Sequence, residues 1–177
     1  MYPLLFEPIL LSKVWGGDRL GKFGKAVEPG AKIGESWELA DLAATSSGGA
    51  GGGAFRSRII NGPLRGKTIH DALEAWRDGL IDAAHRSLTG GYPLLVKYLD
   101  ASENLSVQVH PSPAYASAHP DAHIKSECWC ILDAAPGSVL YKGLKPGITR
   151  QSFEQAIREN KVVDSLVAVP ALSLIHI

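Results

Sequence analysis

The chain has 177 residues, of which 45% are hydrophobic, and its 18 basic side chains are balanced by 18 acidic ones. This length allows one domain with a substantial core, and zero net charge disfavours nucleic acid or an anionic membrane surface as the main partner. No apolar run approaches the roughly 20 residues that span a bilayer, and the N-terminus lacks a signal-peptide pattern. We therefore expect a soluble, cytoplasmic protein that recognises a small molecule.

The N-terminal segment predicts strands separated by turns. Residues 1–14 alternate short apolar runs with prolines, which indicates an extended edge segment, and residues 15–30 are rich in turn formers. Residues 34–39 return to a strand pattern with a period of two, so that Glu35 and Trp37 share one face. Ser36 and Glu38 then share the other.

A change of composition separates this segment from a helical one. Residues 43–54 are almost entirely Gly, Ala and Ser, a composition typical of a flexible insertion. Thr68 is a suitable N-cap for a helix over residues 69–78, in which apolar residues recur at spacings of three and four. A second short helix is expected to extend to about residue 88 and to end at Gly90.

The C-terminal half predicts several short strands and one helix. Turn residues separate the expected strands, which favours an all-β sandwich or barrel. The expected strands are residues 92–101, 105–110, 126–133, 138–144 and 166–170, and the expected helix is residues 149–160, capped by Thr149 or Ser152.

Polar side chains alternate with valines along residues 105–110. Val107 and Val109 point to one face of the expected strand, and Gln108 and His110 to the other. Two side chains on the same strand face lie about 7 Å apart along the chain, close enough to share one ion or ligand. The alternative is that His110 is simply a hydrogen-bonded core or surface residue.

The expected strand at residues 126–133 contains a further candidate ligand, the acid Glu127. Glu127 shares a face with Trp129 and Ile131, whereas Cys128 and Cys130 point the opposite way. We therefore expect the cysteines to be small buried hydrophobic residues in a reducing compartment and not thiolate ligands. Gln108, His110 and Glu127 form a mixed nitrogen and oxygen set suited to zinc or another borderline divalent ion, with room left for substrate.

Two lysines are candidates for contact with an anion. Lys125 shares a strand face with Glu127, and Lys97 lies between two leucines on its strand. Two cations near a metal would suit an anionic substrate such as a phosphate ester. The alternative for both lysines is a solvated or structural charge. His119 and His123 are separated by a proline, so we expect them to be loop residues and not a helical metal pair.

The last six residues, 172–177, look like a translated sequencing adapter, so we expect the natural sequence to end near Ala171. His176 is therefore not a candidate ligand. The alternative is a genuine C-terminal strand.

A resemblance to a known family rests on two long stretches, YPLLVKYLDASENLSVQVHPSPAYA and KSECWCILDAAPGSVLYKGL. They resemble the type I mannose-6-phosphate isomerases, zinc-dependent enzymes of the cupin superfamily. Shorter stretches, WGGDRLGKFG, IGESWELAD and INGPLRGKTI, resemble the N-terminal part of that family and occur in the same order. The similarity covers nearly all of the chain except the Gly/Ala insertion and the tail.

The resemblance implies a mainly β fold, a cupin or double-stranded β-helix (jelly-roll) barrel with helical insertions, incomplete at its C-terminus. Residues 1–171 would be a partial N-terminal cupin-type catalytic domain. Gln108, His110 and Glu127 match the family's zinc ligands. The family's fourth ligand, a second histidine, and a later catalytic arginine have no counterpart in this sequence.

The implied reaction is the interconversion of mannose 6-phosphate and fructose 6-phosphate, an aldose–ketose isomerisation by metal-assisted proton transfer through an enediol. Lys125 is the candidate for proton handling and, with Lys97 and Ser106, matches the family's substrate pocket. Because the ligand set is incomplete, we expect the 177-residue chain itself to be inactive. Alternatives are a non-catalytic sugar-binding or regulatory cupin and, less favoured by the amide ligand, an iron oxygenase. The sequence does not indicate an oligomeric state.

Overall fold

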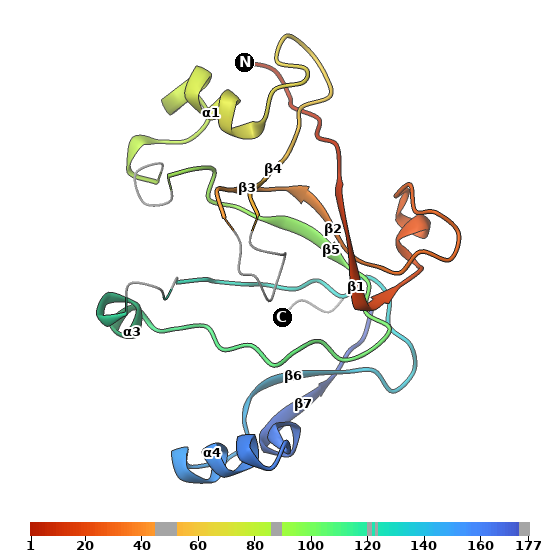
Figure 1. The fold of residues 1–177 in the computed structure, drawn as a ribbon, viewed down its shortest axis with the longest axis vertical. Coiled ribbons are helices and arrows are strands. Elements are labelled where there is room, and N and C mark those ends of the chain that lie inside the picture. The colour runs from red at the N-terminus through yellow and green to blue at the C-terminus, as the bar shows by residue number, and fades with distance from the viewer. Residues whose placement is uncertain (45–52, 86–89, 120–121, 123, 174–177) are drawn as a thin grey trace. The chain divides into compact units, whose positions relative to one another are not determined.

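The computed structural model describes residues 1–44, 53–85, 90–119, 122 and 124–173. The chain forms two compact units, Met1–Val107 and Gln108–Ile177, and each is described by itself (Figure 1). Most of the expected flexible insertion, His123 and His176 lie outside the described residues. The expectation of one cupin-type domain over residues 1–171 stays a prediction.

A three-stranded antiparallel sheet organises the first unit (Figure 1). Its strands are β1 (Ile9–Gly17), β2 (Ile33–Leu39) and β5 (Val96–Leu99), in the order β1-β2-β5. The strand predicted at residues 34–39 is therefore confirmed as β2. The strand predicted over 92–101 is shorter than expected, and β1 extends into the tract predicted to be turns.

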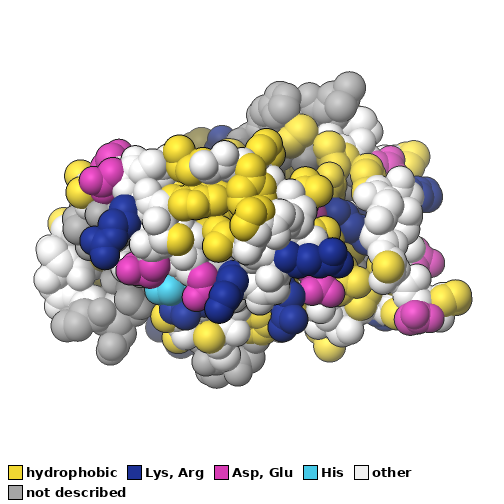
Figure 2. Space-filling view, turned by 90° about the horizontal axis from the view of Figure 1, so that it is seen from above, with side chains coloured by type: hydrophobic (Ala, Val, Ile, Leu, Met, Phe, Trp, Pro, Cys, Tyr) yellow, Lys and Arg dark blue, Asp and Glu magenta, His cyan; other side chains and the backbone are white. Residues whose placement is uncertain are grey.

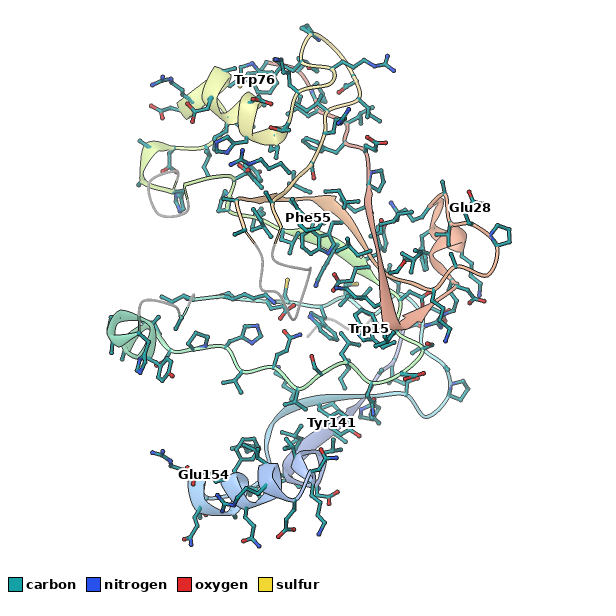
Figure 3. The ribbon with its side chains drawn as sticks, in the orientation of Figure 1. Trp15, Glu28, Phe55, Trp76, Tyr141 and Glu154 are labelled. Carbon is teal, nitrogen blue, oxygen red and sulfur yellow. The ribbon has the colours of Figure 1, made fainter. Side chains whose placement is uncertain are left out.

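The two faces of β2 carry different side chains, as the alternation predicted. The Trp37 indole N–H donates to Glu35 Oε2 at 2.9 Å, so these two side chains lie on one face. The Ser36 hydroxyl donates to Glu38 Oε1 at 2.6 Å on the other. Trp37 is 4% exposed and packs against Phe55, with 5.2 Å between ring centroids; Figure 3 labels Phe55 beside the sheet.

Smaller elements complete the first unit. They are β3 (Asp41–Leu42), β4 (Phe55–Arg56), α1 (Ile69–Trp76) and the 3-10 helices η1 (Leu20–Phe23) and η2 (Arg77–Gly79). The predicted helix is confirmed as α1, and Thr68 caps it in a reciprocal hydrogen-bonded arrangement with Asp71. Residues 83–85 are also helical, whereas 86–89 lie outside the described residues.

One buried carboxylate, that of Asp41, holds several segments of this unit together. Asp41 Oδ2 accepts a hydrogen bond from the Tyr92 backbone N–H at 2.8 Å and lies 3.0 Å from His70 Nδ1. Asp41 Oδ1 lies 3.2 Å from Arg56 Nε. Strands β3 and β4, helix α1 and the chain at Tyr92 therefore meet at one side chain that is 1% exposed.

The second unit contains an antiparallel pair of strands and two helices. The strands β6 (Val139–Leu144) and β7 (Leu166–Pro170) agree with prediction. Helix α4 (Arg150–Arg158) is capped by Thr149, also as predicted. Helix α3 (Pro113–Ala118) and the 3-10 helix η3 (Val162–Ser165) were not predicted. Figure 3 labels Tyr141 on β6 and Glu154 on α4.

Two of the predicted strands are wrong in the structure. Residues 105–110 contain no strand position, and residues 126–133 contain only an isolated bridge at Cys130. Val109 is 82% exposed, so the expected apolar face of the first segment is not buried. Alternation specifies which side chains share a face, but a strand also needs a hydrogen-bonding neighbour, and within the described ranges residues 105–110 have none.

The cysteine prediction also needs correction. Cys128 and Cys130 are both exposed, not buried. Trp129 and Ile131 are partly buried, whereas Glu127, predicted to share their face, is exposed like the cysteines. Among the described residues, no strand ladder runs through this segment, and neither cysteine is covered by a second layer.

Candidate metal and substrate site

Two of the three predicted metal ligands lie together in the second unit. His110 Nε2 and Glu127 Oε2 are 3.1 Å apart, although 17 positions separate them in the sequence. The Glu127 side chain is 21% exposed and that of His110 is 36% exposed. Both donor atoms are therefore close together and reachable from solvent.

Lys125 joins this pair through the same oxygen. Its Nζ lies 3.2 Å from Glu127 Oε2, and its side chain is 44% exposed. One carboxylate oxygen thus lies close to an imidazole nitrogen and to an ammonium group. This arrangement places a group able to carry a proton beside the candidate ligands, and the catalytic role of Lys125 stays a prediction.

The donor atoms present fit a small divalent ion. Zinc binds imidazole nitrogen at about 2.0–2.1 Å and carboxylate oxygen at about 2.0–2.2 Å, so two such donors on one ion lie roughly 3 Å apart. The observed 3.1 Å between His110 and Glu127 is compatible with that spacing. Gln108 is exposed, and its part in the set stays a prediction. Among the described residues, no group of three or more His, Cys, Asp or Glu side chains could hold a metal.

A cavity adjoins His110 within the second unit. Its volume is about 520 Å³, in the range of sites that bind small molecules. Tyr115 and His119 stack with ring centroids 3.9 Å apart, which braces the aromatic ring at the cavity wall. His119 is an exposed residue that follows α3, in agreement with the prediction that it lies in a loop. The cavity is lined by Val109, His110, Pro111, Ser112, Tyr115 and Ala122.

The remaining predicted site residues, Lys97 and Ser106, belong to the first unit. Lys97 Nζ donates to Glu35 Oε1 at 3.0 Å, whereas Ser106 is exposed. The prediction for Lys97 did not include this carboxylate partner. The sequence places Glu35 on the same strand face as Trp37, but it does not specify that this face lies beside Lys97.

Comparisons with known proteins identify the family. The family model described as phosphomannose isomerase type I, catalytic domain, matches residues 5–139. The chain belongs to this family. It is 37% identical over 163 residues to the probable mannose-6-phosphate isomerase GmuF of Bacillus subtilis, covering 88% of this chain and 45% of GmuF. It is 33% identical over 174 residues to mannose-6-phosphate isomerase ManA of the same organism, covering 90% of this chain and 49% of ManA.

A solved structure agrees with these relatives. The crystal structure of the Bacillus subtilis mannose 6-phosphate isomerase matches with a TM-score of 0.78 and 26% sequence identity, over 99% of this chain and 52% of that one. The expected fold, a mainly β cupin, is confirmed. The chain spans about half the length of the curated relatives it matches.

Proposed function

We propose that the protein to which this chain belongs interconverts mannose 6-phosphate and fructose 6-phosphate. The observation that carries the proposal is the 3.1 Å approach of His110 and Glu127 in a chain of the phosphomannose isomerase family. Two of its relatives bear the name mannose-6-phosphate isomerase without qualification. The cavity beside His110 is in the range of volumes that bind small molecules, which supports a small-molecule substrate.

The metal is proposed to be zinc, held by Gln108, His110 and Glu127. Imidazole, carboxylate and amide donors form a mixed set that suits this ion, and a site with three such ligands leaves a position open. When bound, a divalent ion would stabilise negative charge that develops on the sugar oxygens. Glu127 would bind the ion through its carboxylate, which lies beside Lys125.

Lys125 is proposed to handle the proton. Isomerisation removes a proton from C2 of the aldose and returns one at C1, through an enediol. An amine that lies 3.2 Å from the Glu127 carboxylate is held by that contact in one place beside the ligands. Lys97 and Ser106 are proposed to bind the phosphate group of the substrate, where a cation and a hydroxyl donor are suited to a dianion.

The setting of the site is proposed on the same grounds. Residues 1–171 would form one cupin-type catalytic domain, and the protein would act in the cytoplasm on a soluble hexose phosphate. Within the described ranges, no helix is both long and apolar enough to cross a bilayer. On the face seen in Figure 2, basic and acidic side chains lie next to one another, so this face offers no extended field of one sign to nucleic acid.

The test is the His110→Ala variant of the complete gene product. We expect it to lose bound zinc, measured by elemental analysis after gel filtration, together with isomerase activity. His85→Ala is the matched control, because His85 is an exposed histidine of the first unit that is paired with Asp82 and is not a candidate ligand. Stoichiometric zinc in His110→Ala would remove His110 from the ligand set. Sugar binding without turnover in the wild type would favour the non-catalytic cupin.

A further inference from the structure

An unusual ionic cluster lies on the central strand of the first unit. Glu35 is 7% exposed, and its carboxylate lies between a lysine of β1 and a lysine of β5. A carboxylate this deeply buried destabilises a fold by several kcal/mol unless its oxygens are matched by donors. The stability of this buried carboxylate therefore depends on the donors that surround it.

Each oxygen of Glu35 has a defined partner. Oε1 accepts a hydrogen bond from Lys97 Nζ at 3.0 Å, and Oε2 accepts one from the Trp37 indole at 2.9 Å. Lys13 Nζ lies 3.9 Å from Oε2, which is an ion-pair distance but not a hydrogen bond. Glu35 thus fixes the ammonium of Lys97 by a direct bond and attracts that of Lys13 from the opposite strand.

The backbone makes room for Lys13. A Cβ on Gly34 would lie 2.6 Å from both Cβ and Cγ of Lys13, closer than side-chain atoms approach one another. The aliphatic part of Lys13 therefore lies directly against Gly34 of β2, and its ammonium lies 3.9 Å from Glu35 Oε2. The Lys13 and Lys97 side chains are only 16% and 20% exposed, so both charges act where solvent screening is weak.

We propose that Glu35 is a positioning residue that fixes Lys97 for contact with the substrate's phosphate group, and that Lys13 offsets the negative charge of Glu35. A lone Lys97–Glu35 pair would be electrically neutral toward an incoming anion. With Lys13 the three charges sum to one positive charge, so Lys97 keeps its attraction for a phosphate ester. This inference rests on the proposed role of Lys97 in substrate binding.

The first experiment needs no turnover. In the 177-residue chain, lysine acetylation by acetic anhydride is followed by mass spectrometry against increasing inorganic phosphate. Phosphate is expected to protect Lys97 and not the exposed Lys161, and Glu35→Gln is expected to raise the phosphate needed by about three- to tenfold. Absence of protection in the wild type, or equal protection in Glu35→Gln, overturns the inference.

The matched control uses the same strand. Glu38 accepts a hydrogen bond from Lys25 Nζ at 2.7 Å on the other face of β2, so Glu38→Gln removes a comparable carboxylate–lysine bond. In Glu38→Gln, phosphate is expected to protect Lys97 from acetylation at the same concentration as in the wild type. A similar change in both variants would mean a general loosening of the sheet and would overturn a specific role for Glu35. Circular dichroism establishes that each variant is folded.

The second experiment uses the complete gene product and separates binding from chemistry. Glu35→Gln is expected to raise KM for mannose 6-phosphate about three- to tenfold with kcat within about twofold. In combination with Lys97→Met it is expected to add nothing beyond Lys97→Met alone, because Glu35 acts through Lys97. Additive effects overturn the inference. A wild type without isomerase activity would refute the proposed reaction, while the phosphate protection experiment would still decide the role of Glu35.

Discussion

Replacement of Gly17 by alanine tests how closely the loop after β1 is held against β5. Asp100 is 4% exposed, and its carboxylate accepts hydrogen bonds from the Arg19 backbone N–H at 2.6 Å and from Arg19 Nε at 3.1 Å. A Cβ on Gly17 would lie 2.5 Å from Asp100 Oδ1 and 2.6 Å from Cγ. The carboxylate therefore has to move, and the bonds to Arg19 are disturbed.

The expected loss of stability follows from these contacts. Overpacking a buried position costs about 1–3 kcal/mol. Hydrogen bonds to a charged group contribute about 1.5–3 kcal/mol, and part of this is lost when the carboxylate shifts. Since the two effects overlap, we expect Gly17→Ala to lower the free energy of unfolding by about 2–4 kcal/mol.

Urea denaturation followed by circular dichroism measures this difference. Gly21→Ala is the matched control, because Gly21 has no atom within 4 Å of the position where its Cβ would lie. Its expected effect is between zero and a gain of about 1 kcal/mol. Equal midpoints for the two variants at unchanged slope would refute the view that Asp100 leaves no room at Gly17.

Three further predictions concern helix α1. Thr68→Ala should lower the free energy of unfolding by about 1 kcal/mol in thermal denaturation, because the cap on Asp71 is lost; no change would mean that the cap is replaced by water. Hydrogen bonds from Thr68 lower the pKa of Asp71 below its usual value in the folded protein. The ionised Asp71 therefore stabilises the fold at pH values above its pKa in the unfolded chain, and this stabilisation is lost as the pH falls through its pKa in the folded protein. The stability advantage of the wild type over Asp71→Asn should therefore shrink on acidification, and a constant difference would contradict this. Leu73 is 1% exposed, so Leu73→Ala should lower the free energy of unfolding by about 2–5 kcal/mol in urea denaturation. A clearly smaller loss would mean that the surrounding side chains close the cavity.

Local patterns predicted those elements whose stabilising groups are close together in the sequence. Thr68 and Thr149 each lie three residues before their capping partner, so both helix starts could be identified from a short window. The alternation around Glu35 and Trp37 likewise indicated which side chains share a face. These signals depend on side-chain direction and capping alone, which neighbouring residues determine.

The errors arose where a distant partner decides the outcome. Residues 105–110 have the alternation of a strand, but a ladder depends on a second segment that the pattern does not specify. The prediction that Cys128 is buried failed for the same reason, because burial requires a second segment packed over the side chain. The proximity of Lys97 and Glu35, 62 positions apart, was also missed, because register between strands is not encoded within either strand.

The prediction for the candidate site stays untested as a site, but two of its contacts can be compared with the sequence. Lys125 and Glu127 are two residues apart and form an ion pair, although the strand that was expected to align them does not form. The approach of His110 to Glu127 was expected from donor chemistry and from the family resemblance. The position of Gln108 could not be predicted in this way, because an amide side chain is as common at the surface as at a metal.

The Asp41 carboxylate has a consequence for how the first unit opens. It accepts a hydrogen bond from the Tyr92 backbone N–H, lies next to His70 Nδ1 and forms an ion pair with Arg56, so segments up to 51 positions apart meet at one pair of oxygen atoms. Release of any one segment leaves a buried anion with fewer donors, which makes partial opening costly. Amide hydrogens in β4, α1 and the chain around Tyr92 should therefore exchange with deuterium together, as one cooperative unit.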